Sequence, residues 1–86
     1  MSDVKAALLR VLMSGKGYGL ELMARVEDHT NGKVRIRLAI YPALRELEDA
    51  GLLHSYEADP TPERGDRPRR YYELTDAGRN AAEVLP

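Results

Sequence analysis

The feature that most limits how this chain can fold is a proline-rich segment at residues 59–68. It contains three prolines and one glycine, so neither a helix nor a strand continues through it. The residues on either side include several that favour β-strands, such as Tyr56 before it and Tyr71 after it. We therefore expect a hairpin with strands near 52–58 and 69–75, joined by a long tip.

Apolar residues recur with helical spacing in three segments before the hairpin, and a fourth helical segment follows it. Gly15, Gly17 and Gly19 separate the first segment from the second, and Thr75 is a candidate N-cap for the last one. The predicted helices lie near residues 3–14, 18–31, 36–50 and 76–84.

The second predicted helix has a well-defined apolar side. Leu20, Met23 and Ala24 form one apolar stripe, and Leu22 and Val26 lie beside it. A stripe of this kind indicates the side of a helix that faces the core.

Pro42 constrains the start of the third helix. Because proline lacks a backbone N–H, it is tolerated in the first turn of a helix and disrupts later turns. The helix therefore either starts near Tyr41 or begins near Ile36 and bends at the proline.

The predicted elements follow the order helix, helix, helix, strand, long tip, strand, helix. Two helices that meet at a glycine-bearing turn, followed by a hairpin, are typical of a winged helix-turn-helix. We predict a mainly α (α+β) fold with a three-helix core, a two-stranded β wing and a short C-terminal helix. A length of 86 residues is that of one small domain, so residues 1–86 are expected to form a single unit.

The composition argues against an enzyme, a metal site and a membrane protein. The chain has no cysteine, which excludes a disulfide framework and a thiolate nucleophile, and its two histidines, His29 and His54, lie in separate elements. No apolar run approaches the roughly 20 residues of a membrane span, and the N-terminus lacks a signal-peptide pattern. We therefore expect a cytoplasmic domain with no catalytic residues, no metal and no cofactor.

Charge is strongly segregated along the chain, although the net charge is only −1. Residues 33–45 contain four cations and no acid, and residues 64–70 contain four cations and one acid, whereas the rest of the chain is acidic. The two basic segments coincide with the third helix and the tip of the hairpin, which project from the same side of a winged helix. This coincidence predicts a DNA-binding domain whose partner is double-stranded DNA.

Three stretches of the sequence resemble PadR-type transcriptional regulators. Residues 40–48, IYPALRELE, followed by AGLL at 50–53, are similar to the third-helix signature of this family, and residues 65–79, GDRPRRYYELTDAGR, to its wing and last helix. Residues 15–22, GKGYGLEL, are similar to the turn before the second helix. The resemblance implies a winged-helix transcription regulator that acts in the cytoplasm, on the nucleoid when it is bound to DNA.

The chain also departs from the family pattern. The family usually begins its third helix with a serine cap and a glycine, where this chain has Ile36, Arg37, Leu38 and Ala39, and the wing is longer here. Family members usually continue into a C-terminal helical region that forms the dimer and often an effector site. We expect this chain to be a short form, for which a small-molecule effector is doubtful.

The third helix and the loop before it supply the first set of candidate DNA contacts. Arg35 and Arg37 suit guanine edges in the major groove, with phosphate contact as the alternative, and Leu38 either touches a thymine methyl or packs inward. Tyr41 either binds a phosphate or closes the helix against the wing. The remaining candidates here are two cations, Lys33, which would attract phosphate, and Arg45, which either contacts DNA or pairs with Glu48 or Asp49.

The wing and the start of the second helix supply the rest. Arg67 and Arg69, with Arg64 nearby, are candidates for the minor groove or the backbone. Arg70 is also a candidate DNA contact, but it is expected to point with Tyr72 toward the inner side of the sheet, so its alternative is to pack its stem there. Lys16 and Tyr18 precede the second helix, whose free amides can hold a phosphate.

Taken together, these features predict a sequence-specific regulator, most consistent with a repressor, whose third helix enters the major groove while its basic wing lies on the minor groove or backbone. The alternative is a winged-helix module that binds a protein partner and no longer reads DNA. Because one module contacts only one half-site, we expect a homodimer through the first and last helices. The apolar residues available for it are Leu9, Met13, Val84 and Leu85.

Overall fold

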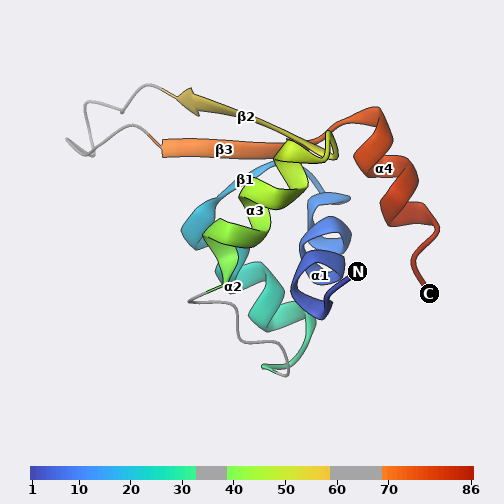
Figure 1. Ribbon diagram of the computed structural model, residues 1–86. Helices are drawn as coiled ribbons and strands as arrows, with labels where there is room; N and C mark the ends of the chain where they lie inside the picture. The colour runs from blue at the N-terminus through green and yellow to red at the C-terminus, as the bar shows by residue number, and fades with distance from the viewer. Residues whose placement is uncertain (33–38, 59–68) are drawn as a thin grey trace.

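The computed structural model describes residues 1–32, 39–58 and 69–86. Within these residues, four helices surround one side of a small sheet, and Figure 1 shows α1, α2 and α3 beneath the strands with α4 beside α1. In chain order the elements are α1 (Asp3–Leu12), β1 (Gly17–Tyr18), α2 (Gly19–His29), α3 (Ile40–Asp49), β2 (Leu53–Ala58), β3 (Arg69–Leu74) and α4 (Asp76–Glu83).

The sheet has three strands in the order β1-β3-β2, all antiparallel to their neighbours. The predicted hairpin is confirmed, with a register that runs from Leu53 opposite Leu74 to Ala58 opposite Arg69. β1 was not predicted. It is only two residues long, too short for any periodicity, and it forms because Gly17 and Tyr18 pair with the free edge of β3.

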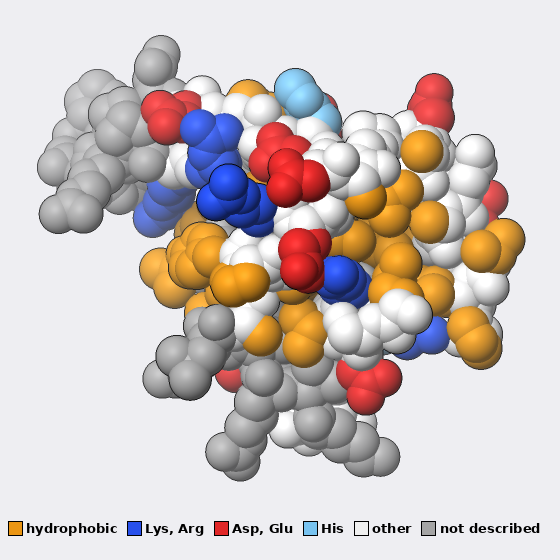
Figure 2. Space-filling model, in the orientation of Figure 1, with side chains coloured by type: hydrophobic (Ala, Val, Ile, Leu, Met, Phe, Trp, Pro, Cys, Tyr) orange, Lys and Arg blue, Asp and Glu red, His pale blue; other side chains and the backbone are white. Residues whose placement is uncertain are grey.

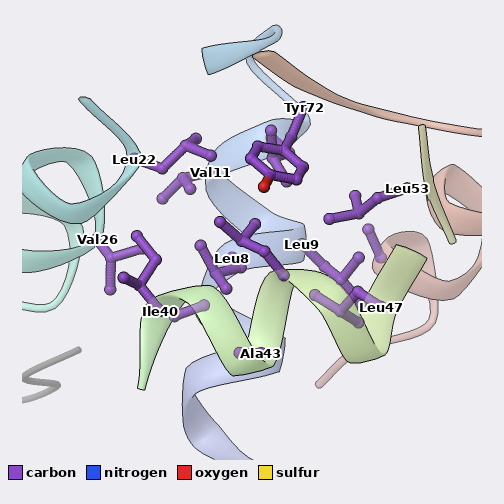
Figure 3. Packing of buried hydrophobic residues seen from close by; sticks show 14 residues of the cluster. Leu8, Leu9, Val11, Leu22, Val26, Ile40, Ala43, Leu47, Leu53 and Tyr72 are labelled. Atoms are coloured by element: carbon purple, nitrogen blue, oxygen red, sulfur yellow. The ribbon is translucent and has the colours of Figure 1, made fainter. Parts of the chain in front are cut away.

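The hydrophobic core is centred on α1, which is buried on more than one side. Leu8, Leu9 and Leu12 are each at most 2% exposed. Figure 3 shows Leu8 and Leu9 above α3, with Leu9 near Leu47 and Leu53. The expectation that Leu9 is available for an interface is therefore wrong, because the hairpin and α3 cover the side of α1 on which it lies.

The core side of α2 also differs from the prediction. Leu22 and Val26 are fully buried, and Met23 packs partly against the core, whereas Leu20 is 66% exposed and Ala24 is exposed. The buried stripe is therefore the one that was predicted to lie beside the main stripe. Leu20 remains at the surface because residues two positions apart project from nearly opposite sides of a helix, and Leu22 faces the core.

α3 begins at Ile40, with Ala39 as its N-cap, so Pro42 lies in the first turn. This start agrees with the predicted start near Tyr41 and places the proline where a helix tolerates it. The predicted start at 36 falls among residues outside the described part of the chain. α2 ends two residues earlier than predicted, because Asn31 and Gly32 have positive φ angles of 53° and 77° and cannot continue the helix.

The last helix is held against the end of α3 by its N-cap. The Thr75 hydroxyl accepts a hydrogen bond from the backbone N–H of Gly78 at 3.0 Å and donates one to the carbonyl oxygen of Gly51 at 2.6 Å. α4 approaches the chain so closely here that a Cβ at Gly78 would lie 1.9 Å from the carbonyl oxygen of Leu52. The predicted role of Thr75 as a cap is confirmed.

Candidate nucleic-acid interface

The start of α2 lies directly against Tyr41 of α3. Tyr18 is the N-cap of α2 in an extended conformation, and its side chain makes no cap hydrogen bond. At Gly19, the first residue of α2, a Cβ would lie 2.8 Å from the Tyr41 hydroxyl oxygen. Tyr41 is nevertheless 55% exposed. The arrangement places an exposed hydroxyl beside the uncapped amides of a helix N-terminus, which is a combination that can hold a phosphate.

Arg45 lies one turn after Tyr41 along α3 and is also exposed. One expectation was that it pairs with Glu48 or Asp49. Among the residues that the structure describes, Arg45 forms no such ion pair, and Glu48 instead accepts a hydrogen bond from Ser55. The guanidinium of Arg45 is therefore on the same helix as the Tyr41 hydroxyl and can meet an anion.

A row of three tyrosines crosses the outer face of the sheet, on the side opposite the core. Tyr71 of β3 contacts Tyr18 edge-on at 5.6 Å between ring centroids and stacks on Tyr56 of β2 at 6.0 Å. The ammonium of Lys16 lies 5.5 Å from the Tyr56 ring centroid, and the Arg69 guanidinium lies 4.2 Å from that of Tyr18. These cation–π contacts gather three predicted DNA contacts, Lys16, Tyr18 and Arg69, at the base of the wing.

The charge of Lys16 is favoured by this environment. A hydrogen bond with the Tyr56 hydroxyl is the main cause that raises the pKa of Lys16, with smaller contributions from the charges of neighbouring groups. Lys16 therefore stays protonated at neutral pH.

Arg70 lies on the inner side of the sheet, as predicted from its alternation with the buried Tyr72. Its guanidinium donates to the Ser55 hydroxyl at 3.0 Å and forms a 3.1 Å ion pair with Glu57, which is its cross-strand neighbour. The charge of Arg70 is thus paired with Glu57 of β2, whereas Arg45 forms no ion pair within the described residues.

The other six predicted DNA contacts lie outside the described residues. They are Lys33, Arg35, Arg37, Leu38, Arg64 and Arg67.

Arg25 has a positioning role that sequence analysis did not identify. Its guanidinium donates hydrogen bonds to the carbonyl oxygens of Gly15 and Lys16, each at 3.2 Å, and to that of Val11. These bonds hold the turn that leads from α1 into β1, and so they place Lys16 and Tyr18. The sequence carries no signal for this role of Arg25, because backbone carbonyl acceptors require no particular residue type.

Side chains of different kinds gather on different parts of the surface. In Figure 2, hydrophobic side chains gather over α1 and α4, whereas lysine and arginine side chains lie beside acidic ones over the wing strands and α3. Within the described residues, no group of three or more histidine, aspartate and glutamate side chains could hold a metal ion.

Comparison with known proteins agrees with this geometry. The sequence profile of the transcriptional regulator PadR-like family matches residues 8–84. The chain belongs to this family. The predicted family and fold are thereby confirmed, and so is the expectation that the protein is a regulator of transcription and not an enzyme.

Solved structures share the fold of this PadR-like protein over nearly its whole length. Bacillus subtilis PadR in complex with operator DNA has a TM-score of 0.82 at 23% identity, over 96% of this chain and 46% of that one. Pex from Synechococcus sp. has a TM-score of 0.72 at 31% identity, over 96% and 79%. A transcriptional regulator from Clostridium thermocellum has a TM-score of 0.77 at 26% identity, over 93% and 75%.

A search of curated protein sequences gave no match. In the described part of the chain, no helix combines the length and the apolar character that a membrane crossing requires.

Proposed function

We propose that this protein binds double-stranded DNA in a sequence-specific way and represses transcription, with α3 in the major groove. The observation that carries this proposal is the position of the exposed Tyr41 hydroxyl beside the uncapped start of α2. A phosphate at this point would accept hydrogen bonds from the first-turn amides of α2 and from Tyr41. Arg45, exposed on the same helix, would neutralise a phosphate nearby.

The wing would supply the second contact with the duplex. Arg69 starts β3, the strand that follows the basic tip of the wing, and its guanidinium is oriented by the ring of Tyr18. We infer that Arg69, with Arg64 and Arg67, lies on the minor groove or backbone, where narrow A·T tracts attract arginine. Lys16 would add a further phosphate contact.

Base recognition is assigned to the residues just before α3. We infer that Arg35 or Arg37 reads guanine and that Leu38 meets a thymine methyl, because a recognition helix presents its first residues to base edges. Lys33 would contact phosphate. Bacillus subtilis PadR, which shares the fold, has been solved in complex with operator DNA, and this supports DNA as the partner.

We further infer that residues 1–86 act as one DNA-binding unit that pairs as a homodimer through α1 and α4. Met13 and Val84 support this arrangement, because they are apolar and 37% and 81% exposed. The hydrophobic area over α1 and α4 in Figure 2 is the surface that would be covered. Two modules would then read two half-sites, and the regulator would act in the cytoplasm, on the nucleoid.

A salt-dependent fluorescence-anisotropy titration on mixed duplexes tests the proposed function. Binding should weaken with rising salt with a log–log slope of about −0.9 per phosphate contacted. One duplex in the pool should bind more tightly than the rest at a fixed salt concentration. Absence of binding to every duplex would instead support the alternative of a module that binds a protein partner.

A further inference from the structure

A chain of polar contacts joins α3 to both strands of the wing on the inner side of the sheet. The Ser55 hydroxyl of β2 donates a hydrogen bond of 2.5 Å to Oε2 of Glu48 in α3 and accepts one of 3.0 Å from Arg70 of β3. Arg70 also forms its 3.1 Å ion pair with Glu57. Three elements are therefore connected through the single hydroxyl of Ser55.

These contacts begin where the hydrophobic core under the hairpin ends. The inner side of the hairpin is buried at Leu53 and Tyr72. Ser55 is half-buried and pairs with Tyr72 across the ladder, and the next pair on the same side, Glu57 and Arg70, is exposed. The hydrogen bond from Ser55 to Glu48 ties this end of the hairpin to α3, and the contacts of Arg70 extend the tie to β3.

We propose that Glu48, Ser55 and Arg70 form a positioning network that sets the angle of the wing relative to α3, and that Arg70 does not itself contact DNA. This proposal rests on the proposed function, because its consequence for DNA needs both α3 and the wing to meet the duplex. Arg70 is bound on one nitrogen to Ser55 and on the other to Glu57, so its guanidinium is already engaged in the free protein.

The network predicts that removing the negative charge of Glu48 weakens the binding of DNA. Removing a carboxylate from a surface that binds a polyanion ordinarily strengthens binding, because one repulsive charge is lost. Glu48 should behave in the opposite way. The Glu48 carboxylate holds Ser55, and Ser55 holds Arg70, so removing the carboxylate leaves the wing less ordered. Ordering the wing again when DNA binds then lowers the net free energy of binding.

The experiment compares two acids at adjacent positions of α3. Glu48→Met removes a carboxylate that contacts the wing, whereas Asp49→Asn removes one that is exposed and has no partner among the described residues. Titrations of the preferred duplex at one salt concentration should show Glu48→Met binding about fivefold to tenfold more weakly than wild type, a factor of ten being about 1.4 kcal/mol. Asp49→Asn should bind as tightly as wild type or more tightly.

Variants at Ser55 complete the DNA test. Ser55→Ala should weaken binding as Glu48→Met does, and Ser55→Thr, which keeps the hydroxyl, should restore most of the affinity. The proposal would be overturned if Glu48→Met and Ser55→Ala both bind the duplex at least as tightly as wild type. It would also be overturned if Asp49→Asn weakens binding as much as Glu48→Met, because the effect would then be one of charge alone.

A measurement without DNA separates this proposal from the proposed function. The backbone amides of Glu57 and Arg70 lie in the hairpin ladder at the level of the network. Amide hydrogen exchange at these positions should be faster in Glu48→Met than in wild type and unchanged in Asp49→Asn. Unchanged exchange in Glu48→Met would overturn the network even if the protein binds DNA. Faster exchange in a protein that binds no duplex would refute the proposed function and leave the network standing.

Discussion

The hydroxyl of Tyr41 occupies the space that a side chain at Gly19 would need, since a Cβ there would lie 2.8 Å from the hydroxyl oxygen and 2.9 Å from Cε1 of the ring. The contact joins the first residue of α2 to the first turn of α3, the two helices of the helix-turn-helix. It explains why glycine stands at this position, although the helix itself would tolerate alanine better.

Replacing Gly19 with alanine should therefore affect DNA binding more than folding. The added methyl displaces the exposed end of a flexible side chain, so we expect the free energy of unfolding to change by about 1 kcal/mol or less. Affinity for duplex should fall, because Tyr41 no longer lies beside the start of α2. In a Tyr41→Ala background, Gly19→Ala should have no further effect on affinity, which a double-mutant cycle measures. Additive effects of the two changes would contradict the contact.

At Gly78, in contrast to Gly19, the atom nearest to an added Cβ belongs to the backbone and not to a flexible side chain. A Cβ at Gly78 would lie 1.9 Å from the carbonyl oxygen of Leu52, which accepts a 3.1 Å hydrogen bond from the backbone N–H of Thr75. Gly78→Ala should lower the free energy of unfolding by about 3 kcal/mol, the upper part of the range for overpacking. Thermal unfolding measures this loss, with the exposed Asn80→Ala as the control. An unchanged melting temperature in Gly78→Ala would show that α4 does not pack as described.

The proposed dimer is tested at Met13 and Val84, and not at Leu9. Met13→Glu combined with Val84→Glu places charge on two exposed positions, so folding should be retained while sedimentation shifts from dimer to monomer. Leu9 is fully buried, and Leu9→Ala should instead cost about 2–5 kcal/mol of stability. Sedimentation of the wild-type protein as a 9.6 kDa monomer at micromolar concentration would contradict the proposed dimer.

Tyr72 should make stability depend on pH at the alkaline end. Burial raises the pKa of Tyr72 above its ordinary value of 10.0, so the folded state favours the neutral hydroxyl. This contribution is complete below pH 10 and is lost as the pH rises through the raised value. Urea unfolding between about pH 9 and 12 should show a decline in wild type that is shallower in Tyr72→Phe. Equal slopes for the two proteins would contradict the burial of an ionisable hydroxyl here.

Local sequence patterns were sufficient to predict most of the architecture. Three helices followed from apolar periodicity and the last from Thr75 as its N-cap, and the hairpin followed from the β-forming residues on either side of the prolines. The position of Arg70 on the inner side of the sheet also followed from simple alternation with Tyr72. Features of this kind depend on neighbours in the sequence, and so the sequence alone reveals them.

The features that were missed depend on residues distant in the chain. Leu9 lies off the main stripe of α1, and only the packing of the hairpin and α3 determines that it is buried. β1 exists because β3 offers an edge about 50 residues later, and it has no pattern of its own. The contacts of Ser55 with Glu48 and Arg70 require the register of the hairpin and its position over α3, neither of which the spacing of charges indicates.

The salt dependence of duplex binding in Arg45→Ala tests the central claim most directly. In the proposed complex the exposed guanidinium of Arg45 binds a phosphate, on the same surface as Tyr41 and the start of α2. The log–log slope of affinity against salt should therefore become shallower by about 0.9 in Arg45→Ala, while Arg79→Ala, a change on the exposed side of α4, leaves it unchanged. A slope in Arg45→Ala equal to that of wild type would contradict the placement of DNA on this surface.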